Sequence, residues 1–234
     1  MELRARLLLG SLLIFSGCDA TYAPLIRAGA YGAPGRLDAG RVEISATTGG
    51  VFIPQVFVPH VGYGVTDWFA VEAGGNIAPG AWYTAFAGTR FSLVPNRHEP
   101  VHFVGDLELG FGGGVGGARY SNAPQSSDSC PDCDGRTYTD RNAFGGYQGL
   151  GVGIKIYWFT LFLRARVEES VTTNVPVTIW PSAMIGFEFD VRRVVSFTLG
   201  GGFIGYHDDT DAEPGWFYQL GLTFFIDTKR DHAP

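Results

Sequence analysis

The stretch WFYQLGLTFFI, from Trp216 to Ile226, decides the expected fold of this chain. Apolar residues alternate in it with polar or small ones. Alternation with a period of two is typical of a β-strand whose two faces have different surroundings. One face carries Tyr218, Leu220, Leu222, Phe224 and Ile226, and the other includes Gln219, Gly221 and Thr223. The surroundings of each face are inferred from the rest of the sequence.

The composition favours a β-rich chain. Its 234 residues include 34 glycines, about double the usual share of roughly 7 %, and 14 % of the residues are aromatic while 17 % are charged. The glycines have no three-residue period, which excludes a collagen-like chain, and the aromatic content argues against disorder. The formal net charge is −6 and no basic run occurs. We therefore expect no nucleic-acid partner.

The first residues have the features of an export signal. Arg4 and Arg6 precede an apolar run, Leu7 to Phe15. This run is too short to cross a bilayer as a helix. We expect residues 1–17 to be a signal peptide that is removed during export.

The end of this signal resembles a bacterial lipobox. The residues are Phe-Ser-Gly-Cys, ending at Cys18, and the resemblance implies that Cys18 is lipidated and becomes the new N-terminus. Ordinary cleavage after Ala20 is the alternative. Ala, Gly and Pro are prominent in the residues that follow, so we expect 18–39 to form a lipidated N-terminus and a flexible tether to the first strand.

Two further cysteines, Cys130 and Cys133, are separated by two residues. With Cys18 assigned to lipid, they form an even pair, and an exported chain reaches an oxidising compartment. A disulfide is the favoured interpretation. A redox centre usually places such a pair at a helix N-terminus, and a metal site needs two more soft ligands.

Two-residue alternation recurs along the chain and predicts ten strands. No run after the signal reaches the 18 consecutive apolar residues of a helical span. Pro59 and Pro181 count against two of the strands, because proline cannot donate to a ladder, and a count of eight is the alternative. The predicted strands cover residues 40–49, 56–66, 69–77, 81–94, 101–113, 145–157, 159–170, 176–189, 194–206 and 215–227.

The connections between these strands alternate between short turns and longer loops. The longest loop, 114–144, is rich in Gly, Ser, Asp and Pro. Bacterial outer-membrane barrels have an even number of strands, short periplasmic turns and longer outer loops. We therefore expect an all-β fold, a transmembrane antiparallel up-and-down β-barrel over residues 40–227, with both barrel ends of the chain on the periplasmic side.

The opening stretch also resembles the last strand of small bacterial outer-membrane β-barrel proteins. Gln219, Gly221, Phe224 and Ile226 match the pattern polar-x-Gly-x-x-hydrophobic-x-hydrophobic of that strand. The resemblance implies the bacterial outer membrane as location, its lipid as surroundings, and the barrel-assembly machinery as a partner during biogenesis. Residues 228–234 would then be a periplasmic tail. A soluble β-sandwich is the alternative fold.

The polar faces of the predicted strands carry charges of both signs in near balance. Balanced charges favour ion pairs that fill a narrow lumen, whereas a selective pore usually shows one sign. We expect a largely plugged barrel with a structural or interaction role in the cell envelope; a narrow channel is the alternative. The expected lumen network consists of Arg41, Glu43, Glu72, Arg90, Asp106, Glu108, Lys155, Arg164, Arg166, Glu168 and Glu188.

The sequence offers little for catalysis. His207, with Asp208, Asp209 and Asp211, is the best candidate for an outer-membrane hydrolase, but no second carboxylate pair faces it. No nucleophile elbow, zinc-protease motif or phosphate loop occurs. We expect no enzyme activity, no cofactor and no metal site. Envelope proteins are expected to bind at the 114–144 loop or on the periplasmic side, because long loops on rigid scaffolds commonly carry recognition.

Overall fold

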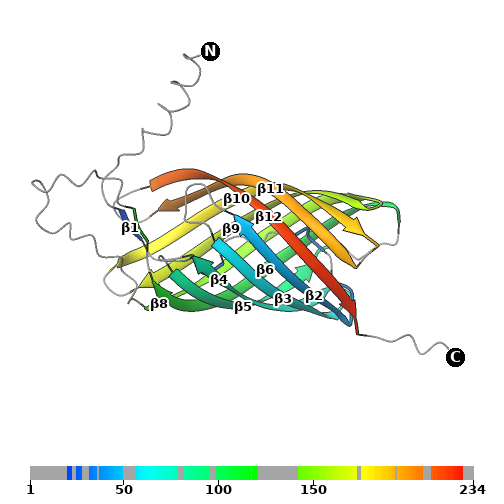
Figure 1. Ribbon diagram of the computed structural model, residues 1–234, viewed down its shortest axis with the longest axis horizontal. Coiled ribbons are helices and arrows are strands. Elements are labelled where there is room, and N and C mark those ends of the chain that lie inside the picture. The colour runs from blue at the N-terminus through cyan, green and yellow to red at the C-terminus, as the bar shows by residue number, and fades with distance from the viewer. Residues whose placement is uncertain are drawn as a thin grey trace, which may run out of the picture.

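Ten strands form one closed antiparallel barrel in the computed structural model of the protein (Figure 1), which confirms the expected fold class. Each strand pairs with the next barrel strand along the chain, and β12 pairs with β2 to close the ring. The barrel strands are β2 (Arg41–Gly49), β3 (Val56–Thr66), β4 (Phe69–Ala78), β5 (Trp82–Ser92), β6 (Val101–Gly116), β8 (Asn142–Ile156), β9 (Phe159–Thr172), β10 (Val175–Val191), β11 (Val195–His207) and β12 (Ala212–Asp227).

The structure describes most of the barrel and parts of the segment before it. The described residues are 20–22, 25–27, 32–35, 37–49, 56–78, 82–94, 99–116, 118–120, 142–172, 175–192, 194–207 and 212–228. Among them, no helix is long and apolar enough to span a membrane. The expected lipidation site Cys18 and the expected disulfide partners Cys130 and Cys133 lie outside these residues.

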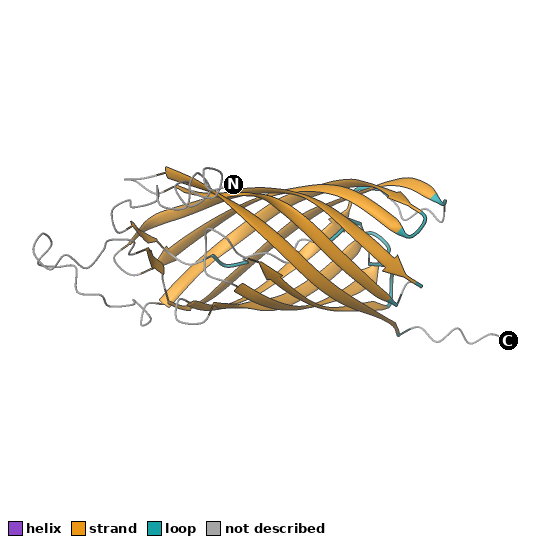
Figure 2. Ribbon diagram, turned by 45° about the horizontal axis from the view of Figure 1, so that its top comes forward, coloured by secondary structure: helices purple, strands orange, loops and turns teal. Residues whose placement is uncertain are grey.

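The two ends of the barrel differ in their connections. The connections between β3 and β4, β5 and β6, β8 and β9, and β10 and β11 lie at one end, together with the start of β2 and the end of β12 (Figure 2). We call this the turn end. The opposite end, which we call the loop end, receives the longer connection between β6 and β8. Hydrogen bonds from the Gly40 amide to Gly64 (2.7 Å) and from the Thr228 amide to Gly40 (2.9 Å) fasten both chain ends of the barrel to its turn end.

Two short strands lie outside the barrel ring. β1 (Ala20–Tyr22) pairs antiparallel with β7 (Ala118–Tyr120), which belongs to the connection between β6 and β8. This pair therefore lies at the loop end (Figure 1). Neither strand was predicted, since β1 falls in the expected tether and β7 in the expected loop, and three residues are too few to show an alternation.

The two prolines that counted against strands lie inside β3 and β10. Each interrupts the ladder on one side only: β3 pairs with β4 at Phe57–Ile77 and again at His60–Gly74, in the same register. The pairing of β10 with β11 likewise stops at Ile179 and resumes at Ser182. On the other side, Pro59 pairs with β2 and Pro181 with β9. The missing N–H of each proline thus removes hydrogen bonds from the ladder locally, but it does not end the strand.

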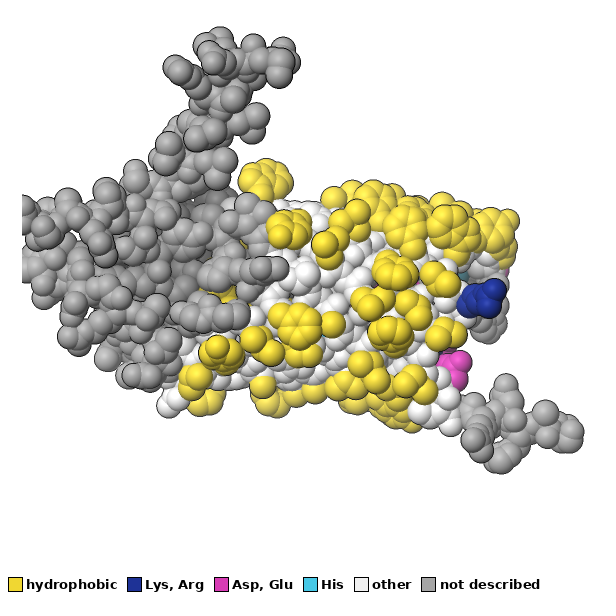
Figure 3. Space-filling view, in the orientation of Figure 1, with side chains coloured by type: hydrophobic (Ala, Val, Ile, Leu, Met, Phe, Trp, Pro, Cys, Tyr) yellow, Lys and Arg dark blue, Asp and Glu magenta, His cyan; other side chains and the backbone are white. Residues whose placement is uncertain are grey.

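The barrel has an apolar exterior and a polar interior. Leu107 is 37 % exposed, whereas the next residue along β6, Glu108, is fully buried. The same alternation holds in β12: Leu220, Phe224 and Ile226 face outward, and Gln219 and Thr223 face the interior. In Figure 3, apolar side chains are spread over the visible part of the wall, and the Lys or Arg and the Asp or Glu side chains in view lie at its turn end. The apolar face of the stretch from Trp216 to Ile226 is therefore the outer face of the barrel.

The segment before β2 runs through the barrel. From β1 at the loop end, the chain passes through the lumen at Leu25, Ile26 and Arg27, all of which are buried, and reaches the turn end at Asp38–Gly40. We call the described residues 25–27, 32–35 and 37 the luminal segment. This arrangement differs from the flexible tether expected over 18–39, because the barrel wall holds these residues.

Candidate functional site

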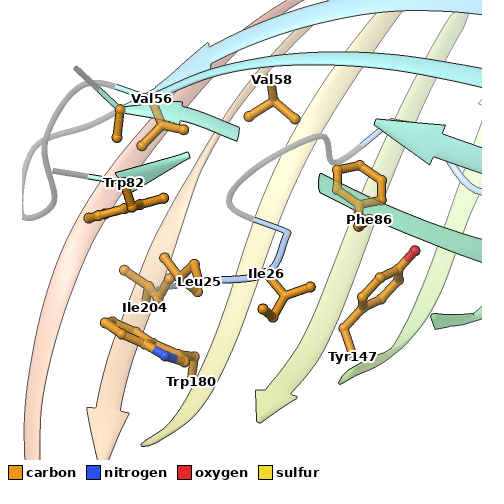
Figure 4. Packing of buried hydrophobic residues seen from close by; sticks show 10 residues of the cluster. Leu25, Ile26, Val56, Val58, Trp82, Phe86, Tyr147, Trp180 and Ile204 are labelled. Carbon is orange, nitrogen blue, oxygen red and sulfur yellow. The ribbon is translucent and has the colours of Figure 1, made fainter. Parts of the chain in front are cut away.

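The lumen is the candidate site, and its first part is an apolar pocket near the loop end. Leu25 and Ile26 of the luminal segment pack there (Figure 4). The pocket leaves room for Ile26 because Gly112 and Gly145 lack side chains: a Cβ atom on either would lie 2.7 or 2.8 Å from Ile26. The wall residues of this cluster are Val56, Val58, Ala78, Trp82, Phe86, Tyr147, Trp180 and Ile204.

Arg27 is the charged centre of the luminal segment. Its guanidinium pairs with the carboxylates of Glu72 and Glu108, the latter at 3.0 Å. The same group lies 5.1 Å from the ring centroid of Phe86 and 5.0 Å from that of Tyr147. Two carboxylates and two aromatic rings thus surround a planar cation, which is a geometry that suits arginine. Arg27 was not among the residues predicted to lie in the lumen, because its only signal in the sequence is its position after two large apolar residues in a segment rich in small ones.

The wall also binds the main chain of the luminal segment. The amides of Ile26 and Arg27 donate to the carboxylate of Glu168 at 3.1 and 2.9 Å. The carbonyl groups accept from other strands: Asn76 donates to Ile26 at 2.6 Å, and Arg166 donates to Arg27 at 3.0 Å. These bonds satisfy main-chain groups that burial would otherwise leave without partners.

Similar contacts continue toward the turn end. The amide of Ala33 donates to Glu188 at 3.1 Å, and the amide of Gly35 donates to Asp106 at 3.2 Å. Ala33 packs in a second buried cluster with Phe162 and Met184. The luminal segment is therefore held at points along its length, and not only at Arg27.

The carboxylate of Glu108 pairs with three guanidinium groups. Besides Arg27, it binds the guanidinium of Arg166 at 2.5 Å and that of Arg164 at 3.0 Å. Arg164 also pairs with Asp106 at 2.9 Å. All of these side chains are buried. Their mutual pairing offsets the desolvation of each charge, which would otherwise be costly.

A second group of polar residues lies nearer the turn end. Arg90 pairs with Glu43 at 2.8 Å and with Glu72 at 3.2 Å. His60 lies between Ser45, at 3.0 Å from Nδ1, and Glu72, at 3.2 Å from Nε2. Serine, histidine and a carboxylate are the groups of a hydrolase triad. Here all three are buried, and Glu72 also binds Arg27, Arg90 and Tyr147.

The remaining members of the expected lumen network pair near the turn end. Lys155 binds Asp190 at 2.9 Å. Arg41 lies 3.5 Å from both Asp38 and Asp227, and its guanidinium stacks on Phe225 at 4.4 Å. Glu188 accepts from Thr198 at 3.2 Å in addition to the luminal segment. Most of the expected charges thus belong to one connected network, which runs from Glu43 through Arg90, Glu72, Arg27 and Glu108 to Arg164 and Asp106.

The other predicted site residues lie apart from this network. Gln219, Gly221, Phe224 and Ile226 are part of β12, which pairs with β11 and β2. His207 is the last residue of β11, and its candidate partners Asp208, Asp209 and Asp211 lie outside the described residues. Within the described part of the chain, no three His, Cys, Asp or Glu residues are grouped as a metal site requires.

Comparison with known proteins gives structural similarity without sequence relatives. No protein-family model matches the chain, and no curated protein matches it. The N-terminal β-barrel domain of OprF from Pseudomonas aeruginosa is 14 % identical, with a TM-score of 0.37, covering 80 % of this chain and 98 % of that one. The outer membrane protease OmpT from Escherichia coli is 7 % identical, with a TM-score of 0.39, covering 80 % of this chain and 96 % of that one.

Proposed function

We propose that this chain is an outer-membrane β-barrel lipoprotein of the bacterial cell envelope, with a structural or interaction role and no enzyme activity. The apolar, exposed wall supports a location in lipid. In hydrocarbon, every main-chain polar group needs a partner within the protein, and a closed barrel meets this requirement. In this proposal the loop end faces the medium, the turn end faces the periplasm, and Cys18 carries the lipid.

One observation carries the proposed role: the chain's own luminal segment occupies the lumen. Leu25, Ile26 and Arg27 are buried among side chains of the wall. Around them, buried cations and carboxylates pair with one another across the interior. A wide conducting pore needs a continuous water-filled path, and these contacts favour a plugged barrel instead.

The buried Ser45–His60–Glu72 arrangement does not favour a hydrolase. A catalytic carboxylate orients its histidine and stabilises the imidazolium that forms. Glu72 instead neutralises Arg27 and Arg90 and accepts from Tyr147. We propose that these residues are part of the packing of the lumen. Interaction with envelope partners would then occur outside the barrel, at the long connection between β6 and β8 or on the periplasmic side.

The proposed location is tested by cell fractionation followed by a gel with heated and unheated samples. We expect the chain in the outer-membrane fraction, with a folded form that migrates differently from the heated form. Recovery as a soluble periplasmic protein without a heat-dependent shift would contradict a membrane barrel.

The proposed plugged state is tested by recording currents from the full chain in planar lipid bilayers. We expect no regular single-channel steps, because the luminal segment and the ion pairs occupy the interior. Reproducible steps from the unmodified chain would favour the narrow channel over a structural or interaction role. The same preparation should show the heat-dependent gel shift, so that the absence of current is not confused with failure of the protein to fold.

A further inference from the structure

The chain before β2 crosses the barrel in one direction. β1 lies at the loop end, and Leu25 and Ile26 then share a buried cluster with Trp82, the residue at which β5 begins on the loop-end side. At the opposite end, the amide of Ala39 donates to Asp67, in the connection between β3 and β4, at 3.1 Å. Residue numbers thus increase from the loop end to the turn end. The residues before β1 therefore start from the loop end.

The processed chain is too short before β1 to return to the other side. Cleavage before Cys18 leaves two residues ahead of Ala20, and cleavage after Ala20 leaves none. An extended chain advances at most about 3.3–3.6 Å per residue, so Cys18 is within roughly 7 Å of Ala20. The apolar band of an outer-membrane barrel is about 25 Å tall. Although Cys18 lies outside the described residues, the new N-terminus therefore stays at the loop end with either cleavage.

The luminal segment keeps this direction fixed in the folded barrel. Arg27 pairs with Glu72 and Glu108, and its amide donates to Glu168 at 2.9 Å. Withdrawal of the segment would leave buried carboxylates without a partner, which is strongly unfavourable. We therefore expect the folded barrel to hold β1 at the loop end.

The loop end offers an acyl chain an apolar surface outside the lumen. Inside, an acyl chain would have to displace buried ion pairs, such as that between Arg164 and Asp106. The outer wall is apolar up to the loop end, since Val171 and Val177 are exposed near the loop-end termini of β9 and β10. β1 lies against β10. We therefore expect acyl chains attached at Cys18 to lie in the bilayer beside this end of the wall.

We propose that the processed chain begins on the medium side of the outer membrane, and that the lipid on Cys18 enters the outer leaflet there. The inference rests on the orientation and lipidation proposed above, and it adds the leaflet in which the anchor lies. The anchor and the end of β12 are then on opposite sides of the membrane. An anchor in the periplasmic leaflet would require the few residues before β1 to cross the membrane again.

The test introduces a free thiol into β1 and measures from which side of the membrane it is labelled. In a background with Cys130→Ser and Cys133→Ser, the full chain carries Thr21→Cys or Tyr22→Cys, which probe the two faces of the strand. The reagent is a maleimide on a large polyethylene glycol, which does not cross the outer membrane. We expect labelling in intact cells at one or both positions. The control Arg192→Cys, in an exposed turn at the turn end, should gain at least about tenfold in labelling when the outer membrane is permeabilised, because a thiol reacts only where the reagent reaches it.

The lipid is followed by incorporation of a labelled fatty acid, which Cys18→Ser should abolish. If neither position of β1 is labelled in intact cells, although the chain shows the heat-dependent gel shift, the inference is wrong and the envelope barrel stands. Labelling of Arg192→Cys in intact cells would overturn the orientation on which the inference rests. Labelling of β1 on a chain that incorporates no fatty acid would overturn the anchor in the outer leaflet. Loss of the gel shift from the unmodified chain would instead contradict the proposed function, and a cysteine variant that alone lacks the shift is replaced by its neighbour.

Discussion

The outer wall and the lumen are built from the same strands, but their side chains have different requirements. Leu107 and Glu108 are neighbours in β6, yet one side chain points away from the barrel and the other is fully buried inside it. The wall needs only apolar surface, which any of several residues can provide. The lumen needs each charge to meet a partner at a particular place. The wall should therefore tolerate apolar substitutions, whereas the lumen should be sensitive to the loss of single polar groups.

The largest loss of folding stability is expected from a substitution in the lumen. Glu108→Ala removes the carboxylate that binds Arg27, Arg164 and Arg166. Leaving buried charges without their partner should lower the free energy of unfolding by about 3–5 kcal/mol. Unfolding by guanidinium chloride in detergent measures this change. The matched control is Glu169→Ala, an exposed residue near the loop-end terminus of β9, where we expect a change within about 0.5 kcal/mol. Equal effects would contradict the distinction between lumen and surface.

A charged residue introduced on the outer wall should cause the second largest loss of folding stability. Leu163→Arg puts a cation in the middle of β9 on the outer face, where Leu163 is 51 % exposed. At the bilayer midplane such a change costs about 2–4 kcal/mol, and near the interface about 0–1 kcal/mol. Val191→Arg, at the end of β10, is the control for depth. Unfolding titrations in lipid vesicles should separate the two variants, and similar values for both would argue against a membrane around the wall.

The smallest loss of folding stability is expected from the replacement of an aromatic residue at the turn end. Trp158 lies beside Phe189 with ring centroids 5.8 Å apart. Loss of an aromatic pair of this kind costs about 0.5–1.5 kcal/mol beyond the buried area. Trp158→Ala should lower the free energy of unfolding by about that amount, and Trp158→Phe should retain most of it. A loss as large as that of Glu108→Ala would show that the turn end is as sensitive as the lumen.

The sequence was sufficient to predict the wall because alternation is a local signal. All ten barrel strands lie within three residues of their expected bounds. The largest differences, of three residues each, are at the loop end, where β6 ends at Gly116, β8 begins at Asn142 and β12 begins at Ala212. These ends are paired through the backbone after the alternation of side chains has stopped. Backbone pairing leaves no signature in residue type, so the outer ends of the strands could not be predicted.

The contents of the lumen could be predicted only in part. Charged residues in strands were recognisable, because their position opposite apolar neighbours indicates an interior face. The luminal segment gave no such signal: Gly, Ala and Pro surround Arg27, and no periodicity is present. Its contacts are also distant in sequence, since Arg27 and Glu168 are separated by 141 residues. Only the closed barrel brings these groups together.

The path of the luminal segment has a consequence for the order in which the barrel assembles. The segment continues into β2 at the turn end, while β1 pairs with β7 at the loop end. Drawing Tyr22, Leu25 and Arg27 through a finished barrel would require the buried pairs of its interior to part. Closing the wall around a segment that is already in place avoids this step. We therefore expect the seam between β12 and β2 to form last, so that the chain wraps itself around its own beginning.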